Sequence, residues 1–208
     1  MTDLVTRGPP ELRQLPRRAA EIIAAARVLL ESEGRDALTM RRLGQVLGIR
    51  APSIYKHLPG KHAVEVALIE AGLAEMGEAS HRAVSGPRTR PGAAAVAGLL
   101  AAYRTESLAR PNLYRLATAG PLPRGELAPG LEEWAGEPWF LATGDPFLAQ
   151  AMWSFAHGMV ILELDHRYPD GSDLDRTWQA GVEAFAVAAG PASGPGQDHP
   201  VRFPMEDA

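Results

Sequence analysis

A cluster of basic, polar and small residues between positions 39 and 61 has the composition of a surface that binds phosphates and base edges. Lysine and arginine neutralise phosphates, and arginine and serine can also hydrogen-bond to base edges. The candidates are Thr39, Arg41, Arg50, Ala51, Pro52, Ser53, Tyr55, Lys56, His57 and Lys61. Taken singly, Tyr55 is also explained as an aromatic residue at the edge of a core, Lys61 as a solvated charge and Thr39 as a helix cap.

Charge is distributed unevenly along the chain. Between Arg13 and His62 there are ten lysines and arginines but four acidic residues, so this region carries +6 although the whole chain carries −4. The rest of the chain must therefore sum to −10. A basic region on an otherwise acidic chain is expected where only that region meets a polyanion. On charge alone, a solvated helix surface explains the pattern equally well.

The first element that positions these candidates is a helix between Pro16 and Gly34. Proline suits a first helical turn, and glycine suits the residue at which a helix stops. The apolar residues between them recur at the spacing of a single helix face and are Ile22, Ala26, Leu29 and Leu30. This pattern predicts a helix that packs one face against a core.

Two shorter helices are predicted next. Thr39 is placed as the N-cap of the first of them, and Gly48 ends it in the left-handed conformation. Pro52 then occupies the first turn of the next helix, which Pro59 and Gly60 terminate. Two short helices joined by a tight turn that contains glycine predict a helix-turn-helix.

The candidate residues occupy the positions that a helix-turn-helix uses for DNA. Its second helix enters the major groove by the N-terminal half, so exposed side chains from Arg50 to His57 should be small, polar or basic. Tyr55 lies at the flank, where its hydroxyl can reach a phosphate. Thr39, Arg41 and Lys61 lie at the starts of the neighbouring helices, where backbone phosphates bind.

The remaining sequence also predicts helices and shows no strand pattern. Pro138 makes residues 132–141 ambiguous, whereas Asp145 followed by Pro146 marks a clear helix start. The other predicted helices span about 61–83, 93–109, a short stretch from Pro111, 145–167 and 173–189. We therefore predict an all-α protein with an N-terminal three-helix helix-turn-helix domain and a C-terminal helical bundle.

Composition suggests four segments along the chain. We expect a flexible arm over residues 1–12, a helix-turn-helix domain over 13–62, a ligand-binding and dimerisation domain over 63–189, and a disordered tail over 190–208. There is no cysteine and no apolar signal-peptide core, so we expect a soluble intracellular protein without a disulfide or a thiolate metal site.

The helix-turn-helix sequence resembles the DNA-binding signature of TetR-family transcriptional regulators. The resemblance covers about residues 13–70 and rests on the segments 38–43, 47–49 and 52–61, the last reading PSIYKHLPGK. It implies that Tyr55 and Lys61 bind phosphates, that Thr39 and Arg41 anchor the second helix, and that residues 50–53 with Lys56 and His57 face base edges. His57 and Leu58 depart from the aromatic residues that the family often has there, so His57 could contact a base or a phosphate.

A weaker resemblance covers residues 153–164, which read WSFAHGMVILEL. They are similar to a Trp, His-Gly and Leu-Glu-Leu pattern in the penultimate helix of one large TetR subgroup, whose last two helices form a four-helix dimer interface. The residues that this resemblance implies for the interface are Phe155, Gly158, Leu162, Leu174, Trp178, Val182 and Phe185. Packing within one chain explains them almost as well.

An effector pocket needs an apolar cavity with a few polar groups. The candidates for such a pocket are Tyr103, Arg104, Tyr114, Trp134, Trp139, Trp153 and His157. Aromatic residues at helical spacing more often belong to a core, and the sequence does not name a ligand.

An enzyme is disfavoured because the hydrolase, phosphate-loop, zinc-protease and dinucleotide motifs are all missing from the sequence. His157, Glu163, Asp165 and His166 do not share a helix face, which disfavours a metal site. We therefore predict a cytoplasmic, bacterial, homodimeric regulator without a cofactor, most simply a repressor that a small-molecule effector releases from a palindromic double-stranded DNA operator. The alternative is a helical dimer that binds a small molecule or a protein and lacks specific DNA recognition.

Overall fold

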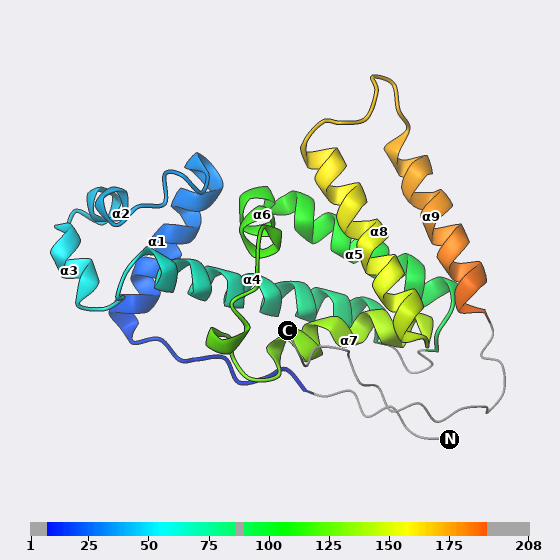
Figure 1. Cartoon of the computed structure of the whole chain (residues 1–208), viewed down its shortest axis with the longest axis horizontal. Helices are drawn as coiled ribbons and strands as arrows, with labels where there is room; N and C mark the ends of the chain where they lie inside the picture. The colour runs from blue at the N-terminus through cyan, green and yellow to red at the C-terminus, as the bar shows by residue number, and fades with distance from the viewer. Residues whose placement is uncertain (1–7, 86–89, 191–208) are drawn as a thin grey trace. The chain divides into compact units, whose positions relative to one another are not determined.

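A computed structural model describes residues 8–85 and 90–190, and within these ranges every regular element is a helix (Figure 1). In chain order the elements are α1 (Arg17–Glu33), α2 (Met40–Leu47), α3 (Ala51–Tyr55), α4 (Lys61–Val84), α5 (Ala93–Ala109), α6 (Pro111–Thr118), the 3-10 turn η1 (Arg124–Glu126), α7 (Leu131–Thr143), α8 (Pro146–Leu164) and α9 (Leu174–Ala189). The predicted all-α class is confirmed. The predicted disordered tail and most of the predicted flexible arm lie outside the described residues.

The described chain forms two compact units. The first contains residues 8–82 and 102–137, and the second contains residues 83–85, 90–101 and 138–190. Helices α4, α5 and α7 therefore contribute residues to both units. The predicted division between a DNA-binding and a ligand-binding domain at residue 62 lies inside the first unit and stays a prediction.

The core of the first unit joins the helix-turn-helix to α1, α4 and α6. Its fully buried side chains include Ile22 and Leu30 from α1, Leu43 from α2 and Ile54 from α3. Burying an aliphatic side chain of this size contributes about 1.5–3 kcal/mol relative to leaving it exposed. The apolar face predicted for α1 is thus the face that holds α2 and α3 in place.

The helix ends follow the predicted capping residues. The Thr39 hydroxyl accepts the backbone N–H of Arg42 at 3.1 Å, and Gly48 ends α2 with a φ of 65°. Asp145 caps α8 through its carboxylate, as predicted, and Asp173, predicted as the first residue of the last helix, caps α9 in the same way. Each cap supplies an acceptor to the first helical turn, which has none of its own.

Helix α7 continues through Pro138, where the sequence is ambiguous. Proline has no N–H, so the carbonyl of Trp134 one turn earlier loses its usual helical donor. The Nε2 atom of His81, on α4, lies 2.9 Å from that carbonyl oxygen and donates in place of the missing N–H. The two rings also stack, with centroids 4.7 Å apart.

In the second unit, α8 and α9 run side by side in opposite directions (Figure 1). The ring of Phe155 lies against Trp178 and Phe185, with centroid distances of 5.8 and 5.5 Å. The turn between the helices begins earlier than the predicted helix end near residue 167, because α8 stops at Leu164 and His166 has a φ of 51°.

Candidate nucleic-acid interface

A glycine inside α2 sets the angle of the helix-turn-helix. A Cβ added to Gly44 would lie 2.7 Å from the carbonyl oxygen of Ile49 and 3.3 Å from the backbone nitrogen of Ala51. The N–H of Ile49 also donates to the carbonyl of Gly44 at 2.9 Å. Backbone atoms cannot move aside as a flexible side chain can, so only glycine lets α2 and the start of α3 approach this closely. Sequence reasoning missed Gly44, although a glycine in a helix interior was the available signal.

Helix α3 presents the predicted recognition residues on the surface. Ile54 is completely buried, while Tyr55, Lys56 and His57 are exposed immediately after it. Arg50 precedes the helix in extended conformation and is also exposed. Among the smaller candidates, Pro52 is exposed and Ala51 and Ser53 are half-buried. One helix thus anchors itself through Ile54 and leaves its polar side chains in contact with water.

Most arginines around this region are already neutralised by carboxylates. The ion pairs are Arg17 and Arg18 with Glu21, Arg27 with Glu75, Arg35 with Glu65, and Arg42 with Glu33. The Arg42 guanidinium lies 2.5 Å from Glu33 and holds the pKa of that carboxyl below its usual value. These pairs leave little net charge on α1.

Unlike those arginines, the cations nearest the recognition helix are not paired with carboxylates of the described residues. Across residues 8–85 and 90–190, no acidic side chain pairs with Arg41, Arg50 or Lys56, and all three are exposed. A positive charge without an internal partner can bind an external anion at no cost in broken ion pairs. The unneutralised charge of the helix-turn-helix is therefore concentrated on α2 and α3.

Two predicted phosphate-binding residues also have roles inside the chain. The Nζ atom of Lys61 donates to the carbonyl of Arg35 at 3.2 Å and lies 3.8 Å from the carboxylate of Glu65. Thr39 caps α2, as described above. Lys61 thus ties the start of α4 to the α1–α2 loop, a contact that its position in the sequence did not indicate.

The candidate pocket residues are divided between the two units. In the first, the Tyr103 and Tyr114 hydroxyls lie 2.9 Å apart, Trp134 is buried against His81, and Arg104 is half-buried. Burial raises the pKa of the Tyr114 phenol above its usual value. Trp139, Trp153 and His157 belong to the second unit, where the rings of Trp153 and His157 stack with centroids 6.0 Å apart. Membership of one pocket stays a prediction for these seven residues.

The candidate interface residues fall into two groups. Phe155, Trp178 and Phe185 pack against one another within the chain, whereas Leu162 is 42% exposed. The rest of the group, Gly158, Leu174 and Val182, is half-buried. By length and composition alone, α8 is long and apolar enough to cross a membrane, as core helices of soluble proteins also are. In an apolar 18-residue stretch of this helix, 28% is buried inside the protein.

Comparison with known proteins identifies the helix-turn-helix. Residues 22–79 match the family model of bacterial regulatory proteins of the tetR family. A 54-residue segment is 46% identical to the tetracycline repressor protein class A of Escherichia coli, covering 26% of this chain and 25% of that protein. The helix-turn-helix segment is that of the tetR family. Over its wider length, the chain is 28% identical to an uncharacterised HTH-type transcriptional regulator of Mycobacterium tuberculosis, covering 83% of this chain and 84% of that one.

Solved structures support the same fold. A protein of unknown function from Rhodococcus sp. RHA1 superposes with a TM-score of 0.66 and 23% identity, covering 83% of this chain and 95% of that one. A TetR variant from Acinetobacter baumannii AYE in complex with minocycline gives a TM-score of 0.58 and 22% identity, covering 84% and 96% of the two chains. Within the described residues, no three histidines and carboxylates lie together as a metal site would require.

Proposed function

We propose that this chain is a homodimeric, sequence-specific repressor of the TetR family that a small-molecule effector releases from a palindromic operator. The observation that carries the proposal is the surface of α2 and α3. It exposes Arg41, Arg50 and Lys56 without acidic partners among the described residues, whereas the arginines of α1 are paired. The unpaired cations of such a surface can bind phosphates, and its polar groups can hydrogen-bond to base edges.

The expected division of labour on DNA follows from exposure. Arg50 and Lys56 are exposed at the two ends of α3 and, with His57, are the residues that we expect to contact base edges. Tyr55 is 53% exposed, so its ring packs partly while its hydroxyl is available to a phosphate. Lys61 would add a phosphate contact from the start of α4 while keeping its hydrogen bond to Arg35. Two copies of this surface would occupy half-sites about one helical turn apart.

The proposed dimer rests on the outer face of α8 and α9. Phe147, Leu162 and Val187 are respectively 77%, 42% and 83% exposed, although all three are large and apolar. Between Phe147 and Leu162, the positions on the same face of α8 hold Ala151, Ser154 and Gly158, which permit close approach of another helix. An apolar face that the chain itself does not cover fits a second copy bearing the same face.

The proposed effector would act through the buried helices. The minocycline complex of the Acinetobacter relative is the observation that supports a small-molecule ligand for this fold. The hydroxyl pair of Tyr103 and Tyr114 is a polar group inside an apolar core, as ligand sites need. Binding there would favour a dimer whose recognition helices no longer match the operator.

Selection of DNA from a random pool by the purified protein, at two salt concentrations, tests the proposal. We expect an inverted repeat at physiological salt, bound by a dimer. Arg50→Ala should weaken binding to that repeat, whereas Arg124→Ala removes the same charge from a residue paired with Glu132 and should leave it unchanged. Recovery of unrelated sequences that wash off with salt would instead favour a helical binding module without specific DNA recognition.

A further inference from the structure

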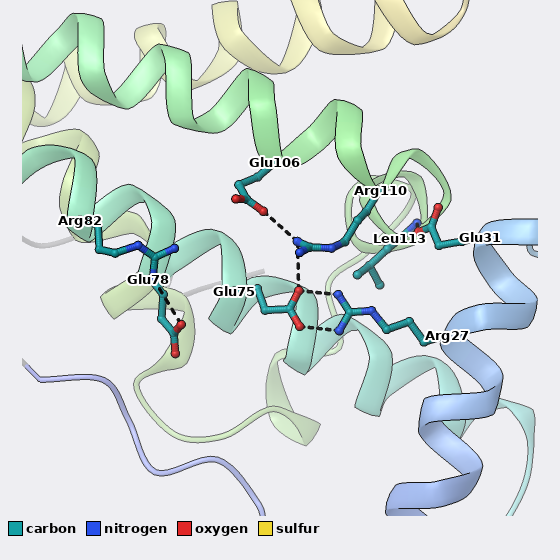
Figure 2. Close-up of polar contacts among 8 residues, drawn as sticks. All are labelled: Arg27, Glu31, Glu75, Glu78, Arg82, Glu106, Arg110 and Leu113. Carbon is teal, nitrogen blue, oxygen red and sulfur yellow. Dashed lines mark hydrogen bonds and ion pairs between the residues drawn. The ribbon is translucent and has the colours of Figure 1, made fainter.

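A chain of alternating charges joins α1 to the junction of α5 and α6 (Figure 2). Arg27, on α1, makes two hydrogen bonds to the carboxylate of Glu75 on α4, of which the one from Nη2 to Oε2 is 2.5 Å long. The same carboxylate lies 3.2 Å from Arg110, the N-cap residue of α6. Arg110 also binds Glu106, one turn earlier on α5, at 2.8 Å. Glu75 thus connects three helices through two arginines.

Glu31, also on α1, caps the N-terminus of α6. Its carboxylate accepts the backbone N–H of Leu113 at 2.8 Å and that of Asn112 at 3.3 Å, and its own carbonyl accepts the Asn112 side chain at 3.0 Å. The N–H groups of a first helical turn have no acceptor within their helix, and a carboxylate there is further favoured by the helix dipole. Closure of this contact therefore determines whether these two N–H groups are bonded.

We name these five charged residues, Arg27, Glu31, Glu75, Glu106 and Arg110, the clasp. The placement of Arg27 and Glu31 on α1 matters because the apolar residues of the same helix, among them Ile22 and Leu30, belong to the core that also contains α2 and α3. Helix α1 thus shares a core with the recognition module and also carries the polar contacts to α4 and α6. The paired state is favoured electrostatically, since Arg27 holds the pKa of Glu75 below its usual value.

We propose that closure of the clasp and operator binding by α3 are coupled equilibria, so that DNA binding tightens the contact of Glu31 with α6, and opening of that contact weakens DNA binding. The proposal rests on the proposed function and deepens it, because it names the junction that an effector must open to release the DNA. Coupling of this kind is reciprocal by thermodynamic necessity, which allows it to be measured from either end.

Hydrogen exchange at the amides of Asn112 and Leu113 measures the coupling from the α6 end. In the full-length protein, the selected operator should slow exchange at both amides by about tenfold, although neither residue belongs to the helix-turn-helix. Random DNA at the same occupancy should slow it less. Glu31→Ala should remove the protection with or without DNA. Exchange at these amides that ignores the operator in the wild-type protein would overturn the proposal.

Operator affinity measures the coupling from the DNA end, with a matched control on the same helix. Glu75→Gln opens the clasp, whereas Glu78→Gln removes an identical charge from a residue whose ion pair, among the described residues, is with Arg82 of the same helix at 3.6 Å (Figure 2). Glu75→Gln should weaken operator binding by about tenfold and leave binding to random DNA unchanged, while Glu78→Gln should change neither. Equal operator affinities for the two variants would overturn the proposed coupling and leave the proposed function intact.

The exchange comparison also separates the two proposals if no operator exists. A wild-type protein without sequence preference would sink the proposed function. Even then, if the clasp holds α1 against α4 and α6, Glu75→Gln should accelerate amide hydrogen exchange in α2 and α3 and at Leu113, whereas Glu78→Gln should not. Equal exchange in both variants would then overturn it independently of DNA.

Discussion

The helix-turn-helix and the α8–α9 pair expose opposite kinds of side chain. Beside the recognition helix, the exposed residues include the cations Arg50 and Lys56, which lack acidic partners among the described residues. On α8 and α9 the exposed side chains include the large apolar residues Phe147, Leu162 and Val187. Burying charges is costly unless an opposite charge meets them, whereas burying apolar area is favourable by itself. The first surface therefore suits a polyanion, and the second suits another apolar surface.

Both regions also use a glycine for close packing, but the two glycines face different neighbours. A Cβ on Gly44 would collide with backbone atoms of the turn, while a Cβ on Gly181 would lie 2.2 Å from the ring of Phe155. A ring can rotate or shift more easily than a backbone. The geometry of the helix-turn-helix is thus fixed more strictly than the spacing of α8 and α9.

A charge introduced on the apolar face of α8 and α9 should have the largest effect, because it should prevent dimer formation. Leu162→Lys should convert the dimer into monomers, because a lysine on the outer face of α8 must be desolvated in the interface. Loss of bivalent binding should weaken operator affinity by about 100-fold or more. Light scattering of the purified variant measures its mass. Val28→Lys is the control, since Val28 is 69% exposed on α1 and is not part of this face, and a monomeric Val28→Lys would refute the proposed interface.

Substitution of Gly44 tests how strictly the geometry of the helix-turn-helix is fixed. Gly44→Ala should lower the free energy of unfolding by about 2–3 kcal/mol, because the methyl group overlaps the carbonyl of Ile49. Thermal unfolding measures this loss, and gel-shift titration should show weaker operator binding by a protein that is still dimeric. Gly136→Ala provides a control in α7, where nothing lies within 4 Å of the added methyl group. Unchanged stability of Gly44→Ala would contradict the close approach of α2 and α3.

Arg50 and Lys61 should respond differently to DNA sequence. Arg50→Ala should cost about 1–2 kcal/mol on the operator and relax preference at one base pair. Lys61→Ala should weaken all sequences alike and lower the salt slope by about one, since a phosphate contact carries no sequence information. Titrations of operator and random DNA at several salt concentrations distinguish the two. Equal losses on both DNAs for Arg50→Ala would remove it from the base-contacting set.

Local signals in the sequence were sufficient for the helices and the helix-turn-helix. Caps and breakers act within a few residues, so Thr39, Gly48 and Asp145 could be identified without knowing the tertiary structure. The apolar face of α1 was also predictable, because helical periodicity alone places its residues on one side.

Contacts between distant residues could not be predicted in this way. The continuity of α7 at Pro138 depends on a donor from His81, which lies 53 residues before the acceptor. The cap of α6 comes from Glu31, more than 80 residues earlier, and neither residue carries a local pattern that names the other. For the candidate site, the types and spacing of the residues predicted which of them are exposed. The ion pair of Arg42 with Glu33 could be identified only from the structure.

The smallest expected effect concerns His157, in the second unit. Burial lowers the pKa of its imidazole below the usual value of about 6.5, so the unfolded chain binds a proton more readily than the folded one. The contribution of His157 to stability should therefore be constant above about pH 6.5 and fall as the pH drops from there towards the folded pKa. Denaturant unfolding at several pH values should show this loss in the wild-type protein and a shallower dependence in His157→Gln. An identical pH dependence in the variant would mean that the ring is equally hydrated in both states, and that the packing of His157 beside Trp153 is looser than the structure indicates.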